Sequence, residues 1–189
     1  MDQAELLRRV IEILEQLDLT YMVVGSVASG AYGEPRLTRD IDIVVRLPAE
    51  QVSGLCQAFG PPDYYVDSNA AMQAALACGQ FNVIHPASGN KVDFVIARND
   101  PWGRMQIHRR RRVRILPDLE GYAAAPEDII LGKMDYYRQG GSEKHARDVA
   151  GMIKVSGELI DRAYVAEWAE RLGLSETWRA VLSRLAEEA

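Results

Sequence analysis

The alternation of apolar and polar positions predicts both helices and strands in the first two thirds of this chain. Residues 3–18 carry leucine, isoleucine and valine at helical spacing, which predicts an amphipathic helix. Residues 21–24 form an apolar run that ends at a glycine, as is typical of a buried strand. Residues 40–47 alternate apolar and polar side chains and indicate a second strand. The small residues at 26–32 favour a short helix that lies close to the sheet.

The middle of the chain continues this mixture of elements. Pro48 begins another helix, and an alanine-rich helix comes after it. Residues 81–85 and 91–96 flank the turn sequence at 88–90, so they are predicted to form a β-hairpin. A further strand is predicted over residues 113–116.

After Pro117 only helical patterns remain. They begin near residues 126, 142, 161 and 175. We therefore expect an α/β (α+β) fold, in which helices flank a mixed β-sheet. Residues 1–117 would form this core, and residues 118–189 would form a C-terminal helical region.

Composition and charge narrow the classes of protein that fit. The chain has 189 residues, of which 48% are hydrophobic and 26% charged, as in ordinary globular proteins. Its net charge of −5 argues against a protein that coats nucleic acid through bulk charge. Cys56 and Cys78 lack Cys-x-x-Cys spacing and are expected to be free thiols in a reducing compartment. Without a signal-peptide pattern or an apolar run of about 18 residues, a cytoplasmic protein is expected.

Two aspartates one residue apart carry the most specific chemistry. Asp40 and Asp42 lie on a predicted strand, so their carboxylates project from the same face. Two acids on one face repel each other unless a cation lies between them. Carboxylate oxygens suit Mg²⁺, or Mn²⁺ in its place, with water and substrate phosphates completing the ligand shell. The Gly25-Ser26 turn upstream could supply phosphate contacts, so this segment is predicted to hold a metal–nucleotide complex.

A third acid, Asp93, lies in the middle of another predicted strand. A carboxylate there needs a reason, because burying an unpaired charge is costly. If this strand pairs beside residues 40–47, Asp93 joins Asp40 and Asp42. Three carboxylates around one or two Mg²⁺ ions suit in-line phosphoryl chemistry, in which the third acid lies closest to the nucleophile.

These motifs resemble the nucleotidyltransferase superfamily that includes DNA polymerase beta. The matching features are Gly25-Ser26, the thirteen-residue gap to Asp40-Ile41-Asp42-Ile43, and Asp93 after Lys91-Val92. Residues 33–42 look like the small bacterial and archaeal branch, which contains abortive-infection type toxins and minimal nucleotidyltransferases. Residues 127–133 and 144–149 resemble the helical half of those proteins.

The resemblance implies a mixed sheet flanked by helices, Mg²⁺ as cofactor and a nucleoside triphosphate, such as ATP, as substrate. By motif position, Gly25 and Ser26 would contact the triphosphate. Asp40 and Asp42 would bind metal, and Asp93 would complete the catalytic and metal-binding triad.

Four basic residues are further candidates for nucleotide binding. Lys133 would approach the phosphates or the nucleotide by its motif position. Lys144 could line the cleft from the helical side, but its spacing to Asp148 fits an intrahelical ion pair equally well. Arg36 and Arg39 flank the acids and could bind phosphate oxygens bidentately, or simply balance the negative charge.

The densest run of charge, Arg109–Arg114, has two interpretations. It could contact RNA or tRNA phosphates beside the site. It could equally be a solvated edge strand, whose positive charge blocks edge-to-edge pairing. Some of its arginines could instead contact the triphosphate.

The expected reaction transfers a nucleoside monophosphate from a triphosphate to an acceptor hydroxyl. The acceptor could be RNA, including tRNA, or a protein, as in toxin–antitoxin or phage-defence systems with a cognate toxin or antitoxin partner. A small molecule of the aminoglycoside kind is a further alternative. The remaining alternative is a non-enzymatic protein that keeps the fold but only binds a nucleotide or a partner. The sequence does not identify the base of the nucleotide.

Overall fold

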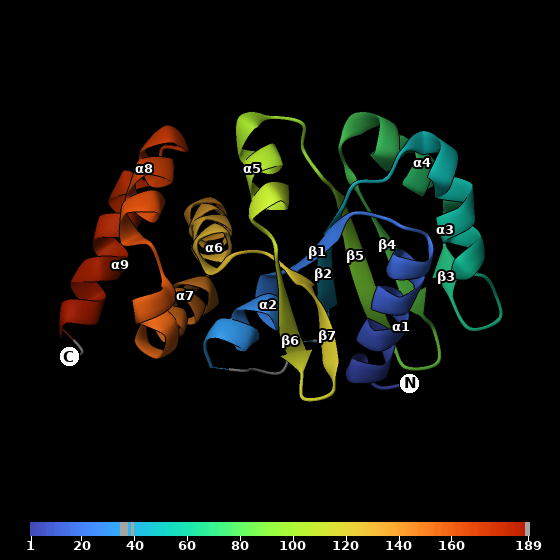
Figure 1. The fold of residues 1–189 in the computed structure, drawn as a ribbon, viewed down its shortest axis with the longest axis horizontal. Coiled ribbons are helices and arrows are strands. Elements are labelled where there is room, and N and C mark those ends of the chain that lie inside the picture. The colour runs from blue at the N-terminus through green and yellow to red at the C-terminus, as the bar shows by residue number, and fades with distance from the viewer. Residues whose placement is uncertain (35–37, 39, 188–189) are drawn as a thin grey trace.

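The computed structural model describes residues 1–34, 38 and 40–187. Within these ranges the strands form one seven-stranded sheet (Figure 1). The strands are β1 Tyr21–Val24, β2 Asp40–Val45, β3 Tyr65–Val66, β4 Gln80–His85, β5 Asn90–Ile96, β6 Arg111–Leu116 and β7 Leu119–Ala123. Their order in the sheet is β3-β4-β5-β2-β1-β7-β6. The pairing is mixed, because β2–β5 and β1–β7 are parallel and the other pairs are antiparallel.

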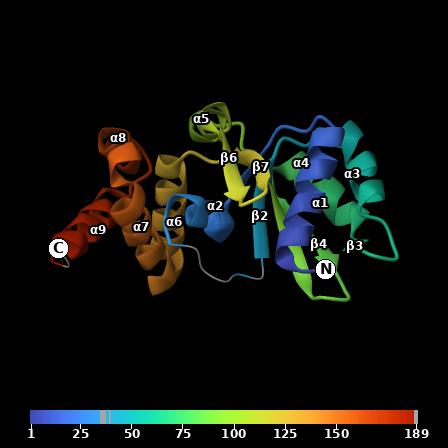
Figure 2. The same ribbon diagram turned by 60° about the horizontal axis from the view of Figure 1, so that its bottom comes forward.

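Helices cover both faces of this sheet. The α-helices are α1 Gln3–Gln16, α2 Gly25–Tyr32, α3 Val52–Ala58, α4 Ser68–Ala77, α5 Pro101–Arg109, α6 Pro126–Gly140, α7 Glu143–Ser156, α8 Arg162–Arg171 and α9 Ser175–Glu187. Figures 1 and 2 show α1, α3 and α4 on one side of the sheet, and α2, α6 and α7 on the other, with α8 and α9 outermost. Among the described residues, no helix is long and apolar enough to cross a membrane. The expected fold class, a mixed sheet flanked by helices, is therefore confirmed.

The two central strands are amphipathic, and this decides which of their faces enters the core. Ile41 and Ile43 of β2 are fully buried, as are Val92 and Phe94 of β5. The ring of Phe94 lies 6.1 Å from that of Phe59, just after α3, so these side chains face the α1, α3 and α4 layer. Because side chains alternate along a strand, the polar residues of β2 and β5 face the opposite side.

Three elements, namely β3, β7 and α5, were not predicted from the sequence. Strand β7 carries the sheet beyond residue 117, to Ala123, while the division of the chain into residues 1–117 and 118–189 stays a prediction. Strand β7 was not predicted because it contains Gly121, and glycine is rare inside strands. A Cβ atom there would lie 2.9 Å from Ile11 Cδ1, so the glycine lets α1 pack closely on the sheet. Helix α5 was also missed, although Asp100 caps it by accepting a hydrogen bond from the Gly103 amide at 2.7 Å.

The C-terminal helices are held against the sheet by close contacts with α2. A Cβ atom on Gly33 would lie 3.0 Å from the backbone nitrogen of Met152, so α7 approaches the end of α2 very closely. The Ser156 hydroxyl donates a hydrogen bond to the Tyr32 carbonyl at 2.6 Å. Since α2 starts at the end of β1, these contacts place α7 relative to the polar face of the sheet.

A polar cluster around two buried acids, here termed the α6 clamp, joins α5, α6 and α8. It consists of Arg109, Glu127, Asp128, Asp161 and Tyr164. Arg109 donates to Glu127 at 2.7 Å, and its guanidinium lies 3.8 Å above the Tyr164 ring. Glu127 also accepts from the backbone amide of Asp161 at 3.0 Å, and Asp128 accepts from the Tyr164 hydroxyl at 3.0 Å. Burial raises the pKa of Asp128 to about 6, against the lowering influence of Tyr164 and Arg109.

Candidate functional site

The pairing of β2 with β5 brings the three predicted acids together. In this parallel register Asp42 lies opposite Asp93, and Asp40 lies opposite Lys91. All four residues belong to the polar face of the two strands, because they occupy alternate positions. The carboxylates that the sequence placed on two distant segments thus form one acidic cluster, which consists of Asp40, Asp42 and Asp93.

The electrostatics of the acidic cluster show that its charges are only partly balanced. Burial raises the pKa of Asp42, and the negative charges of Asp93 and Asp40 raise it further. Lys91 compensates the other two acids, since its Nζ lies 2.7 Å from Asp93 Oδ2 and 3.6 Å from Asp40 Oδ1. A cation therefore already lies between two of the three acids.

The donor set fits a divalent cation in charge and chemistry. Three carboxylates offer the hard oxygen ligands that Mg²⁺ and Mn²⁺ prefer. In the part of the chain that the structure describes, however, no three His, Cys, Asp or Glu side chains are gathered as metal ligands. The ammonium of Lys91 instead holds Asp93 and Asp40. A metal ion would therefore compete with this lysine for the carboxylates of Asp93 and Asp40.

The start of α2 lies directly beside the acidic cluster. Gly25 ends β1 and begins the helix with a φ of 64°, in the left-handed region that favours glycine. A Cβ atom on this residue would lie 2.0 Å from Asp42 Oδ2, so the backbone passes right against the carboxylate. Backbone amides at the start of a helix can attract phosphate oxygens. Gly25 and Ser26 place the start of α2 next to the acidic cluster, and their contact with phosphates stays a prediction.

Replacing Gly25 by alanine should damage both activity and stability. The new methyl group would displace Asp42, and the positive φ would add about 1 kcal/mol of strain. We expect any reaction at the acidic cluster to slow roughly a hundredfold, because displacements near 1 Å have such effects on catalysis. Gly141→Ala is the matched control, since its φ is also 64° but a Cβ atom there meets nothing within 4 Å. Turnover and urea unfolding of both variants test this, and normal turnover in Gly25→Ala would contradict it.

The basic residues predicted from the sequence have different surroundings. Lys133 is 4% exposed, donates to Asp148 Oδ2 at 2.5 Å and lowers the pKa of Asp42 by its charge. Asp148 is thus paired across to α6, whereas the sequence had allowed a pair with Lys144 within α7. Lys144 is exposed in the first turn of α7. The charge of Lys133 thus acts on Asp42, while nucleotide binding by Lys144 stays a prediction.

Two further predicted phosphate ligands, Arg36 and Arg39, lie outside the described residues.

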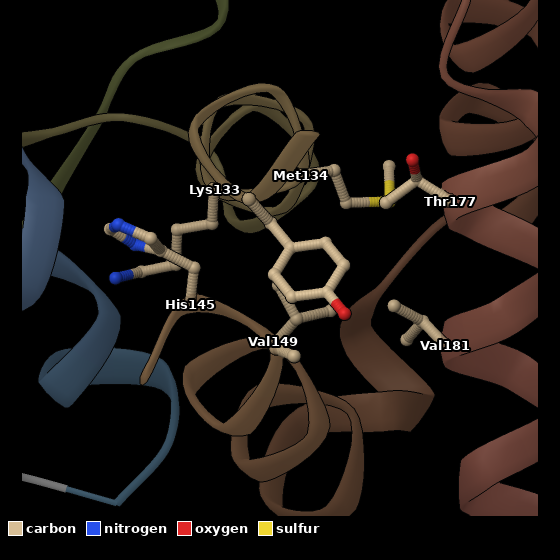
Figure 3. Close-up of a pocket in the computed structure, with 8 residues that line it drawn as sticks. Lys133, Met134, His145, Val149, Thr177 and Val181 are labelled. Atoms are coloured by element: carbon tan, nitrogen blue, oxygen red, sulfur yellow. The ribbon is translucent and has the colours of Figure 1, made fainter. Parts of the chain in front are cut away.

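A small pocket lies between α6, α7 and α9, beside Lys133. Figure 3 shows Lys133 and His145 extending toward α2, while Met134, Thr177 and Val181 line the opposite part. It encloses no room for a ligand of the size that protein pockets usually hold. We therefore do not assign a substrate to this pocket.

The arginine run Arg109–Arg114 is largely engaged within the protein. Arg109 belongs to the α6 clamp, Arg110 donates to the Ile107 carbonyl at 2.7 Å, and Arg112 lies 3.3 Å from Glu15. The residues of the run that are exposed on β6 are Arg111, Arg112 and Arg114. Since β6 is the last strand in the sheet order, these residues occupy a sheet edge, as the second interpretation expected. Contact with RNA stays a prediction.

Two residues near the acids were not recognised as candidates from the sequence. Lys91 comes two positions before Asp93, and this spacing on a strand predicts a shared face. Tyr136 comes three positions after Lys133, and this spacing on a helix likewise predicts neighbours. Both spacings are visible in the sequence. They point to the site only once the structure shows where Asp93 and Lys133 lie.

The fold resembles those of solved nucleotidyltransferases. The solution structure of the antibiotic-resistance factor ANT(2'')-Ia has a TM-score of 0.61 at 15% sequence identity, over 100% of this chain and 98% of that chain. Lincomycin-bound LnuA, a lincosamide antibiotic adenylyltransferase, has a TM-score of 0.56 at 14% identity, over 82% and 98%. An antigenic nucleotidyltransferase-like protein from Paracoccidioides brasiliensis has a TM-score of 0.53 at 21% identity, over 95% and 93%. No protein-family model matches the sequence, and no curated protein does. The nucleotidyltransferase fold that the motifs predicted is thus confirmed.

Proposed function

We propose that this protein is a metal-dependent nucleotidyltransferase, which transfers a nucleoside monophosphate from a nucleoside triphosphate to an acceptor hydroxyl. The observation that carries the proposal is the acidic cluster of Asp40, Asp42 and Asp93 directly beside the start of α2. The fold supports it, because solved proteins of this architecture include adenylyltransferases. A fold alone does not establish an activity, so the site must carry the argument.

Each group of the site has a role in the proposed reaction. The three acids would hold Mg²⁺ or Mn²⁺, which when bound neutralises charge on the triphosphate and lowers the pKa of the attacking hydroxyl. The amides at Gly25 and Ser26 bind phosphate oxygens, and Lys133 attracts them by its charge. Asp93 accepts the proton of the acceptor hydroxyl. The hydroxyl oxygen forms a bond to the α-phosphorus, the bond from that phosphorus to the β-phosphate oxygen breaks, and pyrophosphate leaves.

Among the acceptor classes, a small hydroxylated molecule is best supported. Arg109, Arg110 and Arg112 are engaged with other parts of the protein, which weakens the argument for RNA. The net charge of −5 also disfavours a polyanionic acceptor. ANT(2'')-Ia, a chain of nearly the same extent, is known in complex with adenylyl-2''-tobramycin. RNA, a protein acceptor and a toxin–antitoxin partner are the alternatives that the same experiment tests.

The test is transfer of label from each of the four α-³²P-labelled ribonucleoside triphosphates. Reactions contain Mg²⁺ or Mn²⁺ and one acceptor class each, namely aminoglycosides, lincosamides, total bacterial RNA or lysate protein. We expect label on a small molecule with the wild type and none with Asp42→Asn. Label on RNA or on protein would show that this class, and not a small molecule, is the acceptor. Triphosphate binding without transfer would favour the non-enzymatic nucleotide-binding alternative, and absence of both would overturn the proposal.

Removing the lysine that pairs with the acids should strengthen metal binding. In Lys91→Met no ammonium competes for Asp93 and Asp40, so we expect the Kd for Mn²⁺ without nucleotide to fall about tenfold. Titration followed by electron paramagnetic resonance measures this. Lys154→Met, which removes an exposed lysine near the end of α7, controls for the change in net charge. Equal Mn²⁺ affinity in Lys91→Met and wild type would show that this lysine does not compete with metal.

A further inference from the structure

An exposed aromatic ring lies on α6, three residues beyond Lys133. It belongs to Tyr136, which is 60% exposed. Its ring stacks on that of His145 from α7, with centroids 5.7 Å apart and planes inclined by 24°. The ring is therefore backed by a neighbour on one side and open to solvent elsewhere.

The position of Tyr136 connects it to the candidate site. It follows Lys133 by three residues, so the two side chains are neighbours on the surface of α6. Figure 3 shows His145, on which the ring of Tyr136 stacks, extending together with Lys133 toward α2. The start of α2 lies against Asp42, so the stacked pair of rings adjoins side chains that extend toward the candidate site.

The order of groups along α6 suits a nucleotide. Lys133 offers positive charge beside Asp42, where the phosphates would lie. One helical turn further, Tyr136 offers a flat apolar ring. A ring that is already held by His145 loses little conformational freedom when a second flat group stacks on it. Aromatic side chains of this kind bind nucleobases through stacking, because every base has a π-face.

We propose that Tyr136, backed by His145, is the platform on which the base of the nucleoside triphosphate stacks. This inference rests on the proposed function, because it needs a triphosphate at the acidic cluster. It adds that affinity for the base comes from the ring of Tyr136 and not from its hydroxyl. Stacking tolerates different bases, so the platform by itself holds any of the four with similar geometry.

The test separates the base from the phosphates. Calorimetric titrations with Mg²⁺ compare each of the four ribonucleoside triphosphates with inorganic tripolyphosphate, which lacks a base. In Tyr136→Ala we expect the Kd for the preferred triphosphate to rise about 5- to 150-fold, while the Kd for tripolyphosphate stays within twofold. Tyr136→Phe should bind both ligands like the wild type. Tyr65→Ala, at a tyrosine 57% exposed on β3 at the far edge of the sheet, is the matched control.

The outcomes distinguish this inference from the proposed function. A wild type that binds neither ligand would overturn both. A wild type that binds triphosphate, together with equal binding by Tyr136→Ala, would overturn the stacking platform alone. If Tyr136→Ala weakens the binding of triphosphate and of tripolyphosphate equally, the stacking platform is also overturned, since the effect does not depend on the base. Weak binding in Tyr136→Phe would show that the hydroxyl and not the ring holds the ligand.

Discussion

Asp42→Asn should abolish nucleotidyl transfer, with a loss of at least roughly a thousandfold in turnover, since a metal contributes several kcal/mol to transition-state stabilisation. Asp42 is the central acid of the site: it lies opposite Asp93 in the register and against Gly25 at the start of α2. Asparagine keeps the shape of the side chain but carries no charge to attract a divalent cation. The measurement is transfer of ³²P from the labelled triphosphate to the acceptor found with the wild type.

The same substitution should leave the metal-free protein equally stable or make it more stable. Burial and the charges of Asp93 and Asp40 raise the pKa of Asp42, so the folded protein disfavours its ionised form. A neutral amide removes that penalty. The Tm of metal-free Asp42→Asn should therefore equal or exceed that of the wild type, with Asp63→Asn, at an exposed turn, as the control. A large drop in Tm would mean that Asp42 is structural, and retained turnover would remove it from the site.

Arg109→Met should destabilise the fold by about 3–5 kcal/mol, the usual effect of removing one partner from a buried ion pair. Arg109 is the cation of the α6 clamp, where Glu127 and Asp128 are each 1% exposed. Methionine replaces the length of the side chain but leaves both carboxylates without this partner. Urea unfolding measures the loss, and Arg114→Met, an exposed position of the same arginine run, should change the free energy of unfolding by less than about 0.5 kcal/mol.

The destabilisation of Arg109→Met should also depend on pH. Burial already raises the pKa of Asp128 to about 6, so between about pH 4 and 6 the folded protein holds this proton more tightly than the unfolded chain. Its contribution to stability therefore decreases as the pH rises through that window. Without Arg109 the Asp128 carboxyl should be still harder to ionise, so the loss of stability should be larger at pH 8 than at pH 5. A loss that is the same at both pH values would argue that lost packing, rather than buried charge, is responsible.

The sequence by itself determined the local features of the site. Alternation along residues 40–45 was enough to place Asp40 and Asp42 on one face and Ile41 and Ile43 on the other. The glycine at position 25 marked the end of a strand, and the structure shows a left-handed backbone there, against Asp42. These features depend on the geometry of a few consecutive residues, so they can be read without knowing what lies across from them.

The tertiary structure decided which distant residues meet. Alternation put Asp93 on a polar face, but only the parallel pairing of β5 with β2 sets it opposite Asp42. The arginine run looked like a surface patch, yet Arg109 turned out to pair with buried acids at the start of α6. Strand β7, with its inner Gly121, carried too weak a pattern to be recognised and exists because α1 and the neighbouring strands enclose it. Such contacts depend on the packing of whole elements, whose free energy comes from surfaces far apart in the chain, so no local pattern could reveal them.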